Sequence, residues 1–220
     1  MKRPMRIGLF GGTFDPIHLG HIRAAEEVRS RLGLDRILFI PSNTPPHKRR
    51  AGMAPAADRL AMVRAALRGR PEFAASAIEV ASPRTSYSIV TLAKIRKRYP
   101  SARLFFLLGA DAFLEIKTWR EWRRVLDQCV FIVITRPGTS LRAARAVLEP
   151  EYRDRMAAVA EAADLESGLQ AGRTILFFRI AALPVSSTEI RRRVRDGRSI
   201  EGLVPGGVVA RIHSAKLYQG

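Results

Sequence analysis

The sequence predicts an α/β fold, in which a Rossmann-like, doubly wound parallel sheet of about six strands is covered by helices. Three observations lead to this prediction. Short apolar runs alternate along the chain with helical patterns, which is typical of βαβ units. The runs are apolar at nearly every position, as expected for parallel strands that are buried on both faces. A glycine-rich segment follows the first run and leads into a helical pattern, as expected for a tight turn between a strand and a helix.

The apolar runs and the helical spacing give the predicted elements. Strands are expected at Arg6–Phe10, Arg36–Ile40, Ala77–Val80, Arg103–Leu108, Val130–Thr135 and Thr174–Ile180. Helices are expected at His18–Leu32, Asp58–Leu67, Ser88–Lys97, Trp119–Leu126 and Leu141–Ala163, the last with a break near Pro150. Gly33 directly follows the first helix, where a left-handed residue commonly ends a helix.

The length of 220 residues favours a single domain over residues 1–220, with 183–220 as its C-terminal helical part. The one linker-like stretch is Ser42–Pro55, which is rich in proline and basic residues. A loop of about 14 residues is long for a connection without regular structure, so we interpret it as a functional loop.

The net charge of +18 attracts anions, and nucleic acid is the first candidate. The basic residues are scattered, however, and aromatic residues make up only 7% of the chain without a base-stacking pattern. Small anionic substrates are therefore the preferred interpretation, with no specific nucleic acid and no membrane as partner. The apolar stretch near the start is too short for a secretory signal, which favours a cytoplasmic protein. A homo-oligomer is compatible with the sequence.

Cys129 is the single cysteine of the chain and opens an apolar run. It cannot form a disulfide within the chain. We interpret it as a small buried core residue without reactivity.

The segment Gly8–His21 carries the strongest functional signal. Its glycines let the backbone approach a polyphosphate, and the amide groups and positive dipole end of the following helix favour negative charge. His18 and His21 are three positions apart at the start of that helix and would face the same ligand. Two alternatives are metal ligation, for which the chain has few further ligands, and a buried structural role for the histidines.

Other polar clusters follow the predicted strands, at the edge where parallel sheets bind ligands. These clusters are Pro41–Lys48, Gly109–Asp111, Arg136–Gly138 and Ser186–Arg191. Several of these segments, and two others, also have a simpler interpretation. The prolines of Pro41–Lys48 can simply make a rigid loop. Asp111 and the hydroxyls of Thr85–Ser88 and Ser186–Thr188 can cap helices. Trp119 can be an aromatic residue of the core.

Together these motifs resemble a known family. The run G-G-x-F-D-P-x-H-x-G-H at residues 11–21 resembles the nucleotidyltransferases that share the H-x-G-H signature with class I aminoacyl-tRNA synthetases. P-P-H-K, S-Y-S, G-A-D, T-W and V-S-S-T-E-I-R follow in the order found in the nicotinate mononucleotide adenylyltransferases. One departure is Val90, which stands where relatives often carry aspartate, so a role for that carboxylate has no support in this chain.

The resemblance implies a nucleotidyltransferase-type fold and the transfer of AMP from ATP to nicotinate mononucleotide, with Mg²⁺ carried by ATP and no metal site in the protein. It implies that His18, His21 and Arg191 are catalytic. The implied ATP-binding residues are Gly11, Gly12, Thr13, Phe14, His18, His21, Lys48, Gly109, Asp111, Ser187, Thr188 and Arg191, with residues 183–220 completing this site. The implied acceptor-binding residues are Lys48, Ser86, Tyr87, Ser88, Thr118, Trp119 and Arg136.

Two rival functions stay open at this stage. A sister enzyme that uses nicotinamide mononucleotide or phosphopantetheine would share the phosphate-binding motifs. An RNA-binding protein built on a synthetase-like domain would explain the charge of +18, but no residues remain for a second, RNA-reading domain.

Overall fold

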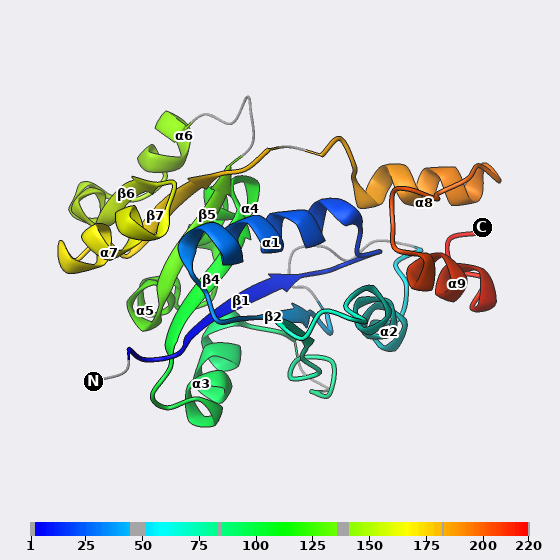
Figure 1. The fold of residues 1–220 in the computed structure, drawn as a ribbon, viewed down its shortest axis with the longest axis horizontal. Helices are drawn as coiled ribbons and strands as arrows, with labels where there is room; N and C mark the ends of the chain where they lie inside the picture. Colours follow the sequence, from blue (N-terminus) through cyan, green and yellow to red (C-terminus); the bar gives the residue numbers. More distant parts are fainter. Residues whose placement is uncertain (1–2, 45–51, 83–84, 136–140, 182, 220) are drawn as a thin grey trace. The chain divides into compact units, whose positions relative to one another are not determined.

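The structure, a computed structural model, describes residues 3–44, 52–82, 85–135, 141–181 and 183–219 (Figure 1). Within these residues the strands are β1 (Arg6–Gly12), β2 (Arg36–Pro41), β3 (Phe73–Ala75), β4 (Arg103–Gly109), β5 (Val130–Thr135), β6 (Met156–Val159) and β7 (Ile175–Arg179). The α-helices are α1 (Leu19–Leu32), α2 (Ala56–Ala66), α3 (Ser88–Arg98), α4 (Ala110–Leu114), α5 (Trp122–Gln128), α6 (Leu141–Ala146), α7 (Ala162–Gln170), α8 (Ser187–Arg195) and α9 (Gly206–Ser214). Two 3₁₀ helices are η1 (Ile116–Thr118) and η2 (Pro150–Arg155). No helix in this described part is both long and apolar enough to cross a membrane.

The strands form a seven-stranded sheet in the order β3-β2-β1-β4-β5-β7-β6. β4 pairs in parallel with β1 and β5, and β7 pairs in parallel with β5 and β6. The chain order reverses between β1 and β4, which is where open α/β sheets bind ligands. The predicted Rossmann-like parallel sheet is confirmed, with seven strands in the described residues where the sequence predicts about six.

Two predicted elements are wrong because their local signal was weak. The third strand is Phe73–Ala75, and the predicted strand Ala77–Val80 instead enters a turn, closed by the Ala81 amide on the Ala77 carbonyl at 2.8 Å. The predicted helix Leu141–Ala163 divides into α6, η2 and β6, although η2 does begin at Pro150. Alanine-rich β6 forms because it pairs with β7, and such pairing overrides helix propensity.

The predicted helix Trp119–Leu126 begins three residues later than expected. Trp119 ends η1 in an extended conformation, and Glu121, the residue before α5, has a left-handed φ of 54°. The chain therefore turns before the helix starts at Trp122.

The chain folds into two compact units, each made of several segments. Unit 1 contains Met1–Phe10, Ala24–Ile37 and Tyr87–Ala182, and unit 2 contains Gly11–Arg23, Leu38–Ser86 and Leu183–Gly220. The boundaries run through β1, α1 and β2, so each unit takes part of these elements.

Unit 1 has helices on both faces of its strands. On one face, Phe177 of β7 lies edge-on to Phe113 of α4 at 6.0 Å and under the guanidinium of Arg145 of α6 at 5.9 Å. The next residue, Phe178, points to the other face and lies 5.0 Å under the guanidinium of Arg31 of α1. Because successive side chains alternate in a strand, α1 covers one face while α4 and α6 cover the other. This arrangement confirms the doubly wound prediction.

Unit 2 has a smaller core of its own. The ring of Phe39 in β2 lies 5.8 Å from that of Phe14 and 5.6 Å from that of Phe73 in β3. Helices α2 and α9 pack closely, since a Cβ on Gly207 would lie 3.2 Å from the Cβ of Ala65. This core holds the turn after β1, which carries the histidines.

Candidate functional site

The turn after β1 is built around the ring of Phe14. Phe14 is buried and has a left-handed φ of 49°, which is uncommon for a bulky residue. Its ring occupies the space beside Gly12, where a Cβ would approach it to 3.1 Å, and it lies edge-on to the ring of His21 at 5.2 Å. Glycine at position 12 thus makes room for an aromatic ring that supports His21.

His18 and His21 are brought together at the start of α1. Their ring centroids are 3.7 Å apart, and His18 is only 4% exposed whereas His21 is half-buried. The His18 carbonyl accepts from the amides of His21 and Ile22, so α1 begins after His18 rather than at it as predicted. Nδ1 of His21 accepts from the His18 amide at 3.3 Å. An accepting nitrogen carries no proton, so neutral His21 has its proton on Nε2, as a donor.

The first amides of α1 differ in their use. The Leu19 amide donates to the Leu203 carbonyl at 3.0 Å, so it is not available to a ligand. The Gly20 amide has no acceptor among the residues that the structure describes. The sequence predicts several open amides at this helix start. In the described residues, the amide of Gly20 is the one that stays open to a ligand.

The start of α8 supplies two more open amides. Ser186 caps the helix, since its hydroxyl accepts from the Glu189 amide at 3.2 Å, which confirms the capping alternative for this hydroxyl. The Ser187 hydroxyl donates to the Pro16 carbonyl at 2.9 Å and so joins α8 to the turn before α1. The amides of Ser187 and Thr188 have no acceptor in the described part of the chain.

The two helix starts are neighbours in unit 2. A Cβ on Gly20 would lie 3.8 Å from the Val185 carbonyl oxygen, and Ser187 contacts Pro16 from the other side. The open amides of Gly20, Ser187 and Thr188 therefore belong to adjacent helix N-termini, whose dipoles both favour negative charge. Such a pair of helix ends is suited to hold an anion.

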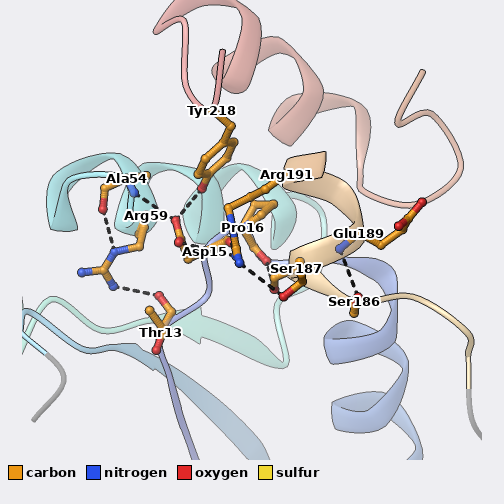
Figure 2. A network of polar contacts seen from close by, with 11 residues as sticks. Thr13, Asp15, Pro16, Ala54, Arg59, Ser186, Ser187, Glu189, Arg191 and Tyr218 are labelled. Atoms are coloured by element: carbon orange, nitrogen blue, oxygen red, sulfur yellow. Dashed lines mark hydrogen bonds and ion pairs between the residues drawn. The ribbon is translucent and has the colours of Figure 1, made fainter. Parts of the chain in front are cut away.

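Arg191 and Asp15 lie beside these helix starts (Figure 2). The Arg191 guanidinium donates from Nη1 to the Asp15 carbonyl at 2.6 Å and lies 3.6 Å from its carboxylate. The Asp15 carboxylate is buried and accepts from the Tyr218 hydroxyl at 2.7 Å and from the Ala54 amide at 3.1 Å. Burial, and then the hydrogen bond to Asp15, raises the pKa of Tyr218, so this hydroxyl stays protonated and acts as the donor.

Arg59 of α2 is a residue that the sequence analysis missed. It is fully buried, and its guanidinium donates to four backbone carbonyls. The acceptors are Ala54 at 3.0 Å, Thr13 at 2.7 Å, Ser42 at 2.7 Å and Asn43 at 2.8 Å. Burial lowers the pKa of Arg59, and the charge of Asp15 opposes this effect. Arg59 thus fixes the turn after β1 against the loop after β2.

The sequence does contain a signal for Arg59. It shares the buried stripe of α2 with Met62, Val63 and Ala66, at spacings of three, four and seven residues. A charged residue on an apolar stripe has to find hydrogen-bond acceptors inside the protein.

Ser86 is held in unit 2 by the loop after β2. Its hydroxyl accepts from the Asn43 amide at 3.1 Å, and its own amide donates to the Thr44 carbonyl at 3.4 Å. The Asn43 side-chain amide donates to the Ser82 carbonyl at 2.6 Å. These bonds give Ser86 a structural use besides its predicted role in acceptor binding.

The predicted site residues of unit 1 lie on α3, α4 and η1. Tyr87 is the N-cap of α3 without a side-chain capping bond and lies under the Arg120 guanidinium at 5.1 Å, while Ser88 is the first helical residue. Among the described residues no side chain caps α3, so the alternative that the hydroxyls of Thr85–Ser88 cap this helix is wrong. Trp119 is half-buried, edge-on to Phe106 at 5.7 Å.

Three other predicted site residues of unit 1, Gly109, Asp111 and Thr118, are exposed. Gly109 ends β4 and is the N-cap of α4, and Asp111 lies inside α4 rather than at its cap, so the capping alternative for Asp111 is wrong. Thr118 donates from its hydroxyl to the Glu115 carbonyl at 2.7 Å.

Two predicted site residues, Lys48 and Arg136, lie outside the described residues. Among the residues that are described, no group of three or more His, Cys, Asp or Glu side chains is placed to hold a metal ion.

Comparisons with known proteins agree with the motifs. A cytidylyltransferase-like family model matches residues 9–193. Probable nicotinate-nucleotide adenylyltransferases from Pelobacter propionicus and Desulfatibacillum aliphaticivorans are 43% and 42% identical to this chain, over 97% of its length and 98% and 100% of theirs. Among solved structures, Plasmodium falciparum nicotinic acid mononucleotide adenylyltransferase complexed with NaAD is similar with a TM-score of 0.70 at 17% identity, covering 97% of each chain. This last likeness shows the fold.

Proposed function

Because the chain belongs to the cytidylyltransferase-like family and, within it, to the nicotinate-nucleotide adenylyltransferases, we propose that it transfers AMP from ATP to nicotinate mononucleotide. The products are nicotinate adenine dinucleotide, also called deamido-NAD, and pyrophosphate. A phosphate oxygen of the mononucleotide attacks the α-phosphorus of ATP, and the bond from that phosphorus to the pyrophosphate oxygen breaks. The reaction needs no nucleophile from the protein. We place it in the cytoplasm.

One observation supports this proposal above the others. Unit 2 places the open amides of Gly20, Ser187 and Thr188 at two adjacent helix N-termini, with His21 and Arg191 on the same two helices. This arrangement supports binding of several negative charges at once, as a triphosphate requires. Residues 183–220 supply α8, so in this proposal they complete the ATP site.

Catalysis in this proposal is positioning and charge stabilisation. The Nε2 proton of His21, the guanidinium of Arg191 and the amides of α8 donate to the phosphate oxygens, where negative charge grows as pyrophosphate leaves. Each charge-assisted contact contributes about 1.5–3 kcal/mol. Buried His18 keeps the ring of His21 in place by packing against it at a centroid distance of 3.7 Å.

The remaining ATP contacts follow from the family motifs. We assign the residues of the glycine-rich turn, and separately Gly109 and Asp111, to nucleotide binding. These residues are Gly11, Gly12, Thr13, Phe14, Lys48, Gly109 and Asp111.

For the acceptor we propose the residues that the family motifs mark. They are Lys48, Ser86, Tyr87, Ser88, Thr118, Trp119 and Arg136. Trp119 offers a half-buried indole on which a pyridine ring can stack. Amide donors near Ser88 favour a carboxylate over a carboxamide, because the amide group of nicotinamide would bring donors against donors.

Mg²⁺ bound to ATP completes the proposal. The ion keeps several waters and takes oxygen ligands from the phosphates, so it needs no carboxylate cage from the protein. The carboxylate of Asp15 is already engaged by Tyr218, Ala54 and Arg191. When bound, the ion neutralises charge on the leaving pyrophosphate.

The test is pyrophosphate release by the purified protein with ATP, Mg²⁺ and one acceptor at a time. The acceptors are nicotinate mononucleotide, nicotinamide mononucleotide and phosphopantetheine. We expect the nicotinate form to react fastest, with His21→Ala lowering kcat by roughly 10²–10³ and Arg191→Ala raising the KM for ATP more than that for the acceptor. Faster reaction with the nicotinamide form would contradict the acid preference, and reaction with phosphopantetheine alone would replace the proposed acceptor.

A further inference from the structure

The hydroxyl of Tyr218 is the feature from which this inference starts. Tyr218 follows α9 and donates to Oδ1 of Asp15 at 2.7 Å, across 203 positions of sequence (Figure 2). Its φ is 64°, and Lys216 is also left-handed, with a φ of 48°. A bulky side chain rarely adopts this conformation, so the surroundings of Tyr218 over-determine its position.

Asp15 receives bonds from three separate segments of unit 2. Oδ1 accepts from the Tyr218 hydroxyl and from the Ala54 amide before α2, while Arg191 of α8 contacts both the carboxylate and the carbonyl. Asp15 is 6% exposed, so these bonds are not in competition with bulk water. A buried carboxylate in such a network has one well-defined orientation.

The residues next to Asp15 contact the phosphate-binding groups directly. Phe14 lies edge-on to the His21 ring at 5.2 Å, and the Pro16 carbonyl accepts from Ser187 at the start of α8. A shift of Asp15 would therefore move its two neighbours together: Phe14, which supports the His21 ring, and Pro16, which contacts the start of α8. The Arg191 guanidinium, which donates to the Asp15 carbonyl at 2.6 Å, would move with them.

We infer that Tyr218 is a positioning residue for phosphoryl transfer: its hydroxyl fixes the Asp15 carboxylate and, through it, His21 and Arg191. This inference rests on the proposed function. In this role Tyr218 acts through Asp15, to which its hydroxyl donates. The hydroxyl is the active part, since the ring alone cannot orient a carboxylate.

The first test compares Tyr218→Phe with the wild type and with Tyr152→Phe, a matched tyrosine substitution on η2 in unit 1. For Tyr218→Phe we expect kcat to fall about ten- to a hundredfold, because small misplacements of catalytic groups have effects of this size. The KM for ATP should rise less than in Arg191→Ala, because the Arg191 guanidinium and the amides of α1 and α8 are still present. Tyr152→Phe should match the wild type. A kcat of Tyr218→Phe within about twofold of the wild type would overturn the inference. The inference would also fail if the decrease in kcat disappeared when the assay is run further below the melting temperature of the variant.

The second test asks whether the effect passes through Asp15. In an Asp15→Ala background the hydroxyl has lost its acceptor, so adding Tyr218→Phe should lower kcat by less than about twofold. An undiminished effect in that background would overturn the inference. The ring-proton resonances of His21 give a readout that does not depend on the stability of Asp15→Ala. They should shift in Tyr218→Phe through the ring current of Phe14, and unchanged resonances would contradict the role.

Failure of the proposed function is separable from failure of this inference. The wild type alone decides whether nicotinate mononucleotide is the acceptor. The His21 resonances of Tyr218→Phe, recorded without any substrate, decide whether the hydroxyl positions His21.

Discussion

Replacing Arg59 should reveal how strongly one buried cation holds the loops of unit 2. In Arg59→Met, four carbonyls lose their charged donor, and hydrogen bonds to charged groups contribute about 1.5–3 kcal/mol each. The simple sum exceeds the real effect because water can reach some of the carbonyls and contributions of neighbouring bonds are not additive. We therefore expect the free energy of unfolding to fall by about 3–5 kcal/mol.

Urea unfolding followed by far-UV circular dichroism measures this loss, and the melting temperature should fall by about 6–20 °C. Arg59→Lys keeps the charge but replaces the planar fork by three donors at one point, so it should recover only part of the loss. Arg64→Met is the control, since Arg64 is exposed on the same helix and should change stability by less than about 0.5 kcal/mol. A loss below about 1 kcal/mol for Arg59→Met would refute the reasoning, because a cation that holds four carbonyls cannot be that dispensable.

Three further predictions concern single positions. Gly20→Ala should lower kcat more than tenfold, because its Cβ would lie 3.0 Å from Nδ1 of buried His18 and would displace that ring. Steady-state kinetics with unchanged kcat would contradict this. Burial raises the pKa of the Cys129 thiol from 9.0 to about 12, so iodoacetamide at pH 8 should label this thiol only after unfolding, and labelling of the folded protein would refute the prediction. The free energy of unfolding should decrease as the pH rises from 9 to about 12, because only the unfolded chain readily loses the thiol proton in this range. Trp119→Ala should raise the KM for the pyridine nucleotide and leave that for ATP nearly unchanged, and an equal rise in both would argue against stacking.

The strands were predictable wherever burial on both faces leaves a continuous apolar run. Val130–Thr135 has the expected bounds, and β1, β2 and β4 extend the predicted runs by one or two residues into glycine or proline. β6 was not predictable, because Met156–Val159 is alanine-rich and becomes a strand only through its pairing with β7. Local sequence does not contain that long-range contact.

The candidate site divides in the same way. The glycine-rich turn, His18, His21 and the start of α8 follow from short motifs whose residues are close in sequence. Arg59 lies 46 positions from Thr13 and Tyr218 lies 203 positions from Asp15, and neither contact leaves a local pattern. The residues that we propose to contact ligands were therefore easier to predict than the residues that hold them in place.

The way in which unit 2 is assembled has a consequence for synthesis of the chain. Unit 1 has all of its residues once position 182 has been made, whereas unit 2 needs Gly11–Arg23 and Leu183–Gly220 together. Contacts between residues far apart in sequence form late in folding, and domains made first on the ribosome generally fold first. A nascent chain that ends before α8 can thus have a folded sheet while its glycine-rich turn still lacks Ser187, Arg191 and Tyr218. Under the proposed function, the ability to hold a triphosphate would then arise only after residues 183–220 have been made and have joined unit 2.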